Sequence, residues 1–260
     1  MNDPWTHLKA FTAARIALGR AGGSVPTAPL LDFRLSHARA RDAVLTPFEP
    51  AELAAQLAEI TVTYGLENLQ LSSHAEDRAM YLRRPDYGRR LSEASRKMLG
   101  GRSGATCDLV IVLSDGLSTS AVMKQSAPLL QALLPLLIQD RWSLAPVCIV
   151  KHGRVAVQDE IGSLLKAQVS LMLLGERPGL GSPDSLGAYF TYAPYVGRTD
   201  ADRNCVSNIR PEGLPIQAAA SKLRYLLNES RRLKLSGVEL KDESPITLAD
   251  EESSPAITSA

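Results

Sequence analysis

The chain has 260 residues, a formal net charge of +1, 45% hydrophobic residues and 22% charged residues. This length suits one large α/β domain, or a compact domain with an extension, and is too short for two full-sized enzymes. The composition is ordinary for a globular protein and excludes collagen-like and wholly disordered chains. The small net charge, with no block of consecutive basic residues, argues against nucleic acid as a partner.

No membrane segment or secretory signal is predicted. The longest nearly apolar stretch, 127–138, is shorter than a bilayer crossing and contains two prolines. The first ten residues lack the basic-then-apolar pattern of a signal peptide. Three scattered cysteines, Cys107, Cys148 and Cys205, are too few for a disulfide framework. We therefore expect a reducing compartment, with the cytoplasm as the default.

The first hundred residues predict a mainly helical region that contacts a partner. Asp3 and Pro4 suit the start of a helix of roughly a dozen residues. Apolar spacing predicts further helices over 30–45 and 52–57, and a short strand is expected at 60–64. A basic segment follows over 81–98. Four of its arginines could be either solvated surface or part of a protein interface, and we favour the interface because arginine is enriched there; they are Arg83, Arg84, Arg89 and Arg90.

The sequence GGRSG at 100–104 resembles a linker, after which a second domain is predicted. Short apolar runs that alternate with helical patterns predict buried parallel strands joined by right-handed crossovers. We therefore predict an α/β fold: a Rossmann-like, mostly parallel sheet flanked by helices, with a helical N-terminal extension. The expected strands are 108–113, 146–150, 169–174 and 189–192, and the expected later helices are 159–166 and 217–233. The expected parts are 1–100, a Rossmann-like domain at 101–240, to which the resemblance described below assigns cobalamin binding, and a disordered acidic tail at 241–260.

In such a sheet, ligands bind where loops leave the carboxyl ends of the strands. The loops 114–118, 151–155 and 175–181 are expected there, and none contains a glycine-rich phosphate-binding pattern. Ser118 could be a nucleophile or the N-cap of the following helix. The cap is favoured, because the G-x-S-x-G pattern of a nucleophile elbow is missing.

Two residues lack a simple structural explanation. Glu176, with Arg177, follows a buried strand and could form a solvated ion pair or contact a ligand. Cys205 lies in the polar stretch DRNCVSNIR, where no core periodicity accounts for it. The cysteines and histidines show no metal-ligand spacing, so no metal site is predicted.

Six segments occur together in one order: LLDFRLSHARARDAVL (30–45), YLRRPDYGRRL (81–91), VIVLSDGLST (110–119), VKHGRVAVQDEIG (150–162), LLGERPGLGSPDSL (173–186) and DRNCVSNIRPEG (202–213). With them the sequence resembles the small, or light, subunit of ethanolamine ammonia-lyase. The resemblance covers most of residues 5–240, and its most specific parts are SDGLST, GERPGLG and DRNCVSNI.

The resemblance implies a carbon–nitrogen lyase that converts ethanolamine to acetaldehyde and ammonia with adenosylcobalamin. The small subunit would help to enclose the cobalamin against a catalytic large subunit, in a hexamer of large–small pairs. Cobalamin contacts carry over to Val155, Glu176 and Cys205, and no catalytic residue carries over to this chain. Some relatives are packaged in a bacterial microcompartment, so the cytoplasm or such a compartment is expected.

Two other function classes stay open from the residues alone. One is a stand-alone α/β enzyme or nucleotide-binding module that uses Asp115, Ser118 and Glu176. The other is a purely structural partner protein that binds through its basic helices. A cofactor carries its own difficult chemistry, which fits a chain without an evident acid–base pair.

Overall fold

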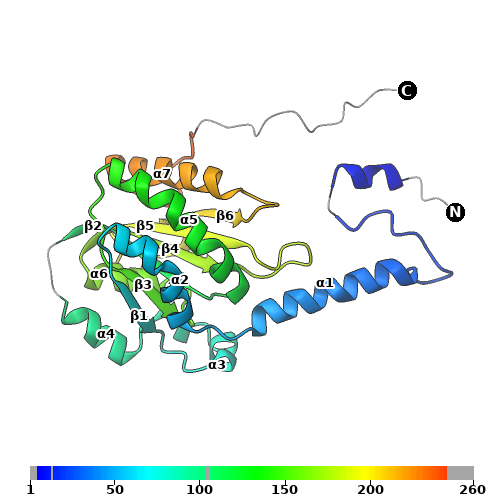
Figure 1. Cartoon of the computed structure of the whole chain (residues 1–260), viewed down its shortest axis with the longest axis horizontal. Helices are drawn as coiled ribbons and strands as arrows, with labels where there is room; N and C mark the ends of the chain where they lie inside the picture. Colours follow the sequence, from blue (N-terminus) through cyan, green and yellow to red (C-terminus); the bar gives the residue numbers. More distant parts are fainter. Residues whose placement is uncertain (1–4, 13, 103–105, 245–260) are drawn as a thin grey trace.

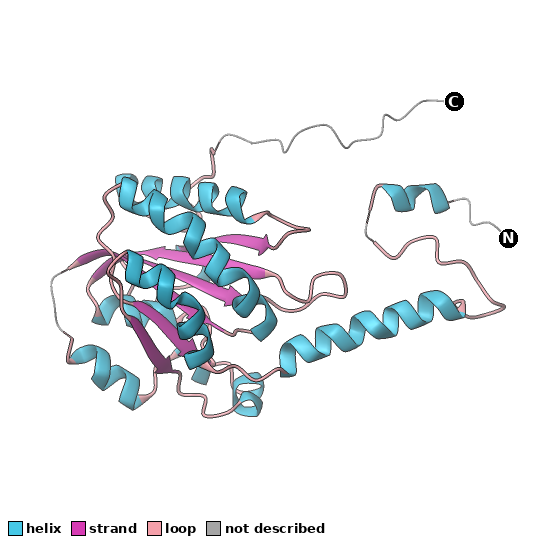
Figure 2. Cartoon of the chain, viewed as in Figure 1, coloured by secondary structure: helices cyan, strands magenta, loops and turns pink. Residues whose placement is uncertain are grey.

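The computed structural model describes residues 5–12, 14–102 and 106–244. A six-stranded sheet is covered by helices, and a helical N-terminal region extends from it (Figures 1 and 2). The predicted fold class is confirmed. The strands are β1 (Asn68–Ser72), β2 (Cys107–Ser114), β3 (Val147–Lys151), β4 (Ala167–Gly175), β5 (Leu186–Tyr192) and β6 (Arg203–Ile209). The α-helices are α1 (Thr27–Leu45), α2 (Pro50–Thr63), α3 (Arg78–Arg83), α4 (Glu93–Gly100), α5 (Thr119–Gln139), α6 (Val157–Leu164) and α7 (Ile216–Leu233), and the 3-10 helices are η1 (Thr6–Ala10), η2 (Tyr87–Arg89) and η3 (Asp200–Asp202).

The strand order in the sheet is β1-β3-β2-β4-β5-β6. The first four strands of this order are parallel, whereas β5 and β6 add an antiparallel edge. The three apolar runs of the sequence are confirmed as β2, β3 and β4, because strands covered on both faces are apolar throughout. The sheet also takes in β1, which precedes the linker-like sequence at 100–104.

The two faces of the sheet carry separate apolar clusters. Leucines from α2, α5 and α7 pack on one face, together with Leu171 and Leu173 of β4. Leucine, isoleucine and valine from α4 and α6 pack on the other face, together with Met172 and Leu174. Successive side chains of a strand point to opposite faces, so β4 serves both clusters. We call the second one the α6 face.

The expected strand at 60–64 is wrong, because these residues form the last turn of α2. Ile60, Thr61 and Val62 are β-branched and favour a strand locally. Leu53, Leu57 and Thr61, however, are buried at helical spacing, and the Thr61 hydroxyl donates a hydrogen bond to the Leu57 carbonyl oxygen at 3.0 Å. Packing against the sheet therefore outweighs the local preference.

The start of the N-terminal region also differs from the prediction. The expected first helix is only the short η1, and its predicted start at Asp3 and Pro4 lies outside the described residues. The helix predicted at 30–45 is confirmed as α1, which extends away from the sheet (Figure 1). Most of the predicted tail, 245–260, lies outside the described residues, as do 103–105 of the predicted linker.

Within the described chain, α5 is the one helix long and apolar enough to cross a membrane. Half of its apolar window is buried inside the molecule, where Leu130 and Leu134 belong to the core cluster on the sheet. This burial identifies α5 as a core helix.

Asp140, just after α5, ties this helix to α7. Its carboxylate accepts hydrogen bonds from Arg224 at 2.6 and 2.7 Å and from Asn228 at 2.6 Å, and the Arg224 bonds lower the pKa of Asp140 to about 2. Because the folded pKa lies below the unfolded value, the stabilisation is present above about pH 4 and is lost as the pH falls toward 2.

We expect Asp140→Asn to lower the free energy of unfolding by about 1 kcal/mol at pH 7, less than the full shift implies because Arg224 is partly exposed. The difference from the wild type should shrink at pH 2.5. Urea unfolding at both pH values measures it, and an equal difference at both would contradict the pKa argument.

Candidate functional site

The loops after β2, β3 and β4 meet at the carboxyl edge of the sheet, as predicted. The side chain of buried Asp115 ties the loops after β2 and β3 together, and the Leu117 backbone N–H joins the end of β4 by donating to the Gly175 carbonyl oxygen at 2.9 Å. The Asp115 Oδ1 accepts a hydrogen bond from the His152 backbone at 2.8 Å, and its Oδ2 accepts one from Arg78 at 2.7 Å. The Ser114 hydroxyl donates a third at 3.1 Å. These bonds occupy the carboxylate, so Asp115 holds the loops in place.

Ser118 is the N-cap of α5, as favoured above. Its Oγ accepts a hydrogen bond from the Ala121 backbone at 3.1 Å and donates one to the Pro183 carbonyl oxygen at 2.8 Å. With Asp115 and Ser118 both engaged in structural bonds, the stand-alone enzyme loses its candidate nucleophile and its candidate carboxylate.

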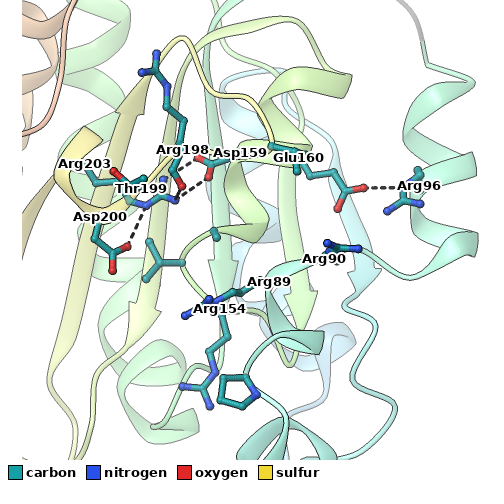
Figure 3. Close-up of a pocket in the computed structure, with 15 residues that line it drawn as sticks. Arg89, Arg90, Arg96, Arg154, Asp159, Glu160, Arg198, Thr199, Asp200 and Arg203 are labelled. Carbon is teal, nitrogen blue, oxygen red and sulfur yellow. Dashed lines mark hydrogen bonds and ion pairs between the residues drawn. The ribbon is translucent and has the colours of Figure 1, made fainter.

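A hollow of about 740 Å³ lies beside α6 (Figure 3). One wall is formed by α6 and the loop before it. A second wall is formed by η2 and the residues next to it, and a third by the segment that leads into β6. The charged residues that line it are Arg89, Arg90, Arg96, Arg154, Arg198, Arg203, Asp159, Glu160 and Asp200. Arginines outnumber carboxylates here, so the hollow attracts anions.

Ion pairs neutralise only part of this charge. Arg203 pairs with Asp159 at 2.8 Å, and both side chains are almost fully buried. Arg96 pairs with Glu160 at 2.6 Å, and Figure 3 shows the two pairs on opposite sides of the hollow. Arg198 pairs with Asp202. Over the described residues, no carboxylate lies within 4 Å of the three remaining arginines, which are Arg89, Arg90 and Arg154.

Two of the three residues expected to contact a cofactor lie close together. Glu176 follows β4, and its Oε2 accepts hydrogen bonds from the Ser185 hydroxyl and, at 3.2 Å, from the Asn208 backbone. Its bonds are therefore to these groups, and among the described residues it forms no ion pair with Arg177. Cys205 lies on β6 directly opposite Tyr189 of β5.

Tyr189 connects Cys205 with Glu176. Burial of the thiol is the main cause that raises the pKa of Cys205 to about 11; a hydrogen bond with Tyr189 lowers it and the charge of Glu176 raises it, and the thiol stays protonated at neutral pH. Burial also raises the pKa of the Tyr189 phenol, with further contributions from Cys205 and Glu176. The three side chains thus form one group at the open end of the sheet, and Tyr189 packs against the apolar cluster of the α6 face.

Val155 lies elsewhere on the same face. It lines the hollow and packs against the same apolar cluster as Tyr189. Arg203, which also lines the hollow, precedes Cys205 by two residues and therefore points to the same side of β6. The hollow and the Glu176–Tyr189–Cys205 group consequently adjoin along β6.

Sequence reasoning missed β6, Tyr189 as a site residue and the hollow. The buried residues of β6 on the core side are Val206 and Ile209, three positions apart, and the pairing with β5 has a register shift at Leu186/Ala188. This irregularity removes the period of two that marks a strand. Tyr189 lies within the predicted strand 189–192, but without β6 no signal in the sequence places it opposite Cys205.

A Rossmann-like sheet with an arginine-lined hollow beside an exposed strand face defines an α/β protein with a candidate ligand site. Comparison with known proteins makes this specific: residues 2–241 match the model of the family described as ethanolamine ammonia-lyase light chain (EutC). The chain belongs to this family, a family of lyase subunits.

Several relatives share most of the chain. An ethanolamine ammonia-lyase small subunit from Azotobacter vinelandii is 55% identical over 251 residues, which are 95% of this chain and 92% of the relative. Proteins of the same name from Xanthomonas campestris pv. campestris and Pseudomonas aeruginosa are 54% and 52% identical, over 93% and 96% of this chain and 89% and 91% of the relatives. The resemblance inferred from the six segments is confirmed.

Proposed function

We propose that this chain helps to hold adenosylcobalamin against a larger, catalytic subunit of ethanolamine ammonia-lyase, which converts ethanolamine to acetaldehyde and ammonia. The observation that carries the proposal is the open face along β5 and β6, where Glu176, Tyr189 and Cys205 lie together next to a hollow lined by Val155. A surface of this kind suits a ligand too large for a closed pocket.

The residues present fit a corrinoid. A corrin is a broad, mainly apolar ring edged with amide groups, and it needs apolar contact together with hydrogen-bond acceptors. Val155 and Tyr189 supply apolar surface. Glu176 uses Oε2 for its internal bonds, and its Oε1 accepts no hydrogen bond from the described residues, so it can accept one from an amide.

When bound, adenosylcobalamin would supply a carbon radical through homolysis of its cobalt–carbon bond. This chain would orient the ring, keep water from its edge and hold Cys205 as a neutral thiol at neutral pH. We assign it no catalytic residue.

The larger subunit would complete the enclosure, in a hexamer of large–small pairs located in the cytoplasm or a bacterial microcompartment. Several apolar side chains on α1 are exposed and suit contact with that subunit, because they lie on a helix that extends from the sheet. They are Leu30, Leu31, Phe33 and Leu35.

We expect Glu176→Ala and Cys205→Ala to weaken cobalamin retention by the complex with the larger subunit about 10-fold or more, since each removes a contact at the ring edge. Subunit pairing should be unchanged. Gel filtration with absorbance at a corrinoid wavelength measures both quantities at once.

Glu212→Ala, which removes an exposed carboxylate after β6, is the matched control and should retain cobalamin fully. If Glu176→Ala reduces pairing and retention equally, or reduces neither, Glu176 does not belong to the cofactor site. Acetaldehyde formation should require this chain, the larger subunit and adenosylcobalamin together.

A further inference from the structure

The three unpaired arginines of the hollow are brought together by one backbone contact. The backbone N–H of Arg154 donates to the Gly88 carbonyl oxygen at 2.7 Å. A Cβ on Gly88 would lie 2.6 Å from Cγ of Arg154 and 3.0 Å from the His152 carbonyl oxygen, so this approach requires glycine. Arg89 and Arg90 follow Gly88 directly and line the hollow together with Arg154; Figure 3 shows Arg89 beside Arg154 and Arg90 on the side of the hollow nearer to Arg96.

Arg154 is held in place while part of it stays free for a ligand. Its guanidinium lies 4.1 Å from the centre of the Tyr81 ring, and its Nη2 donates to the Tyr81 carbonyl oxygen at 3.1 Å. Its Nε is buried and bonds to nothing in the described part of the chain. Its Nη1 is not buried and donates no hydrogen bond to the described residues, so this is the donor that an anion in the hollow can reach.

The ligand should carry a small anionic group that a guanidinium group can bind through two hydrogen bonds. Phosphate oxygens match this geometry. The carboxylates of the hollow are already paired with Arg96 and Arg203, which leaves the cluster uncompensated. Val155 is adjacent to Arg154 in the chain, so a corrinoid that contacts Val155 has its edge beside the cluster.

We propose that Arg89, Arg90 and Arg154 bind the phosphodiester in the nucleotide tail of the corrinoid; this inference rests on the function proposed above. The phosphodiester is the one anionic group of the cobalamin tail, whereas the amides of the ring are neutral. Because the three arginines lie beside Val155, which we propose contacts the corrin ring, they would determine on which side of the ring the nucleotide tail lies.

The test uses the complex of this chain with its larger subunit and three corrinoids that share the same axial cyanide ligand. Cobalamin has the phosphodiester and the base, cobinamide phosphate has the phosphate without the base, and cobinamide has neither. We expect wild-type complex to bind the first two more tightly than the third.

The variants are Arg89→Gln/Arg90→Gln and, separately, Arg154→Gln. Each should weaken binding of cobalamin and cobinamide phosphate about 10- to 100-fold and leave cobinamide binding unchanged. Arg154→Lys, which keeps the positive charge and loses the two-point hydrogen bonding of the guanidinium, should give an intermediate loss of affinity.

The control is Arg83→Gln, which removes an exposed arginine of the same segment outside the hollow and should leave the affinity for all three corrinoids unchanged. Because Arg89 and Arg90 are exposed, the double variant should fold, and thermal melting checks this.

Equal weakening of all three corrinoids, or no weakening, would overturn the phosphate site. Equal wild-type affinity for cobalamin and cobinamide would also overturn it, while leaving the proposed function intact. A complex that binds no corrinoid would refute the proposed function itself. Excess inorganic phosphate should compete with cobalamin and not with cobinamide; phosphate that binds the arginines without this competition would indicate a separate anion site and overturn the proposal.

Discussion

Arg203→Ala is expected to lower the free energy of unfolding by about 3–5 kcal/mol at pH 8.5, because it leaves Asp159, whose pKa burial already raises to about 7, as a buried carboxylate without its partner. The Arg203 and Asp159 side chains are 4% and 2% exposed, and they pair at 2.8 Å. Arg203 also donates to the Thr191 hydroxyl at 3.3 Å and to the Arg198 carbonyl oxygen at 2.9 Å. Denaturant unfolding at pH 8.5 measures the loss.

Two further variants separate this effect from the mere loss of an arginine. Arg232→Ala breaks an exposed ion pair with Glu229 and should change the stability far less than Arg203→Ala does. The double variant Arg203→Met/Asp159→Leu removes both charges and should regain most of the stability lost in the single variant. A cost for Arg203→Ala no larger than that for Arg232→Ala would contradict the argument.

The same pair matters for the site, because it joins α6 to the start of β6. These two elements form facing walls of the hollow, and Cys205 lies two residues beyond Arg203. Loss of the pair should therefore loosen the arrangement of Val155 relative to Cys205 even where the sheet itself stays folded.

Much of the sheet could be predicted from the sequence. Strands β2, β3 and β4 are continuous apolar runs because both of their faces are covered, and a local window detects such a run. Glu176 was expected at the carboxyl edge for the same reason, since it follows the third of these runs. Ser118 was recognised as a cap from its position before a helical pattern.

Other features depend on contacts between distant segments and leave no local pattern. The end of α2 has strand-forming residues that become helical only because Leu57 and Thr61 pack against the sheet. The hollow exists because Gly88 lets η2 approach Arg154, which is 66 residues further along the chain. The roles expected of Val155 and Cys205 came from family resemblance, and no periodicity pointed to them.

Gly175→Ala is expected to destabilise the protein by several kcal/mol, because the new methyl group has no space. A Cβ at this position would lie 2.1 Å from the Ser118 carbonyl oxygen and 2.4 Å from that of Asp115. Both are backbone atoms of the buried β2–α5 turn, so no side-chain rotation relieves the clash. The Gly175 carbonyl oxygen also accepts a hydrogen bond from the Leu117 backbone at 2.9 Å, which the displacement would break.

Gly181→Ala, in the same loop, is the matched control, because a Cβ there meets nothing within 4 Å and its cost should stay within about 0.5 kcal/mol. Denaturant unfolding compares the two, and equal midpoints would contradict the steric argument. Because Glu176 follows Gly175 directly, the shift at Gly175 should also move the carboxylate away from Ser185 and Asn208. The complex that contains the Gly175→Ala chain should therefore retain less cobalamin than the complex that contains the Gly181→Ala chain, even at temperatures where both chains are fully folded.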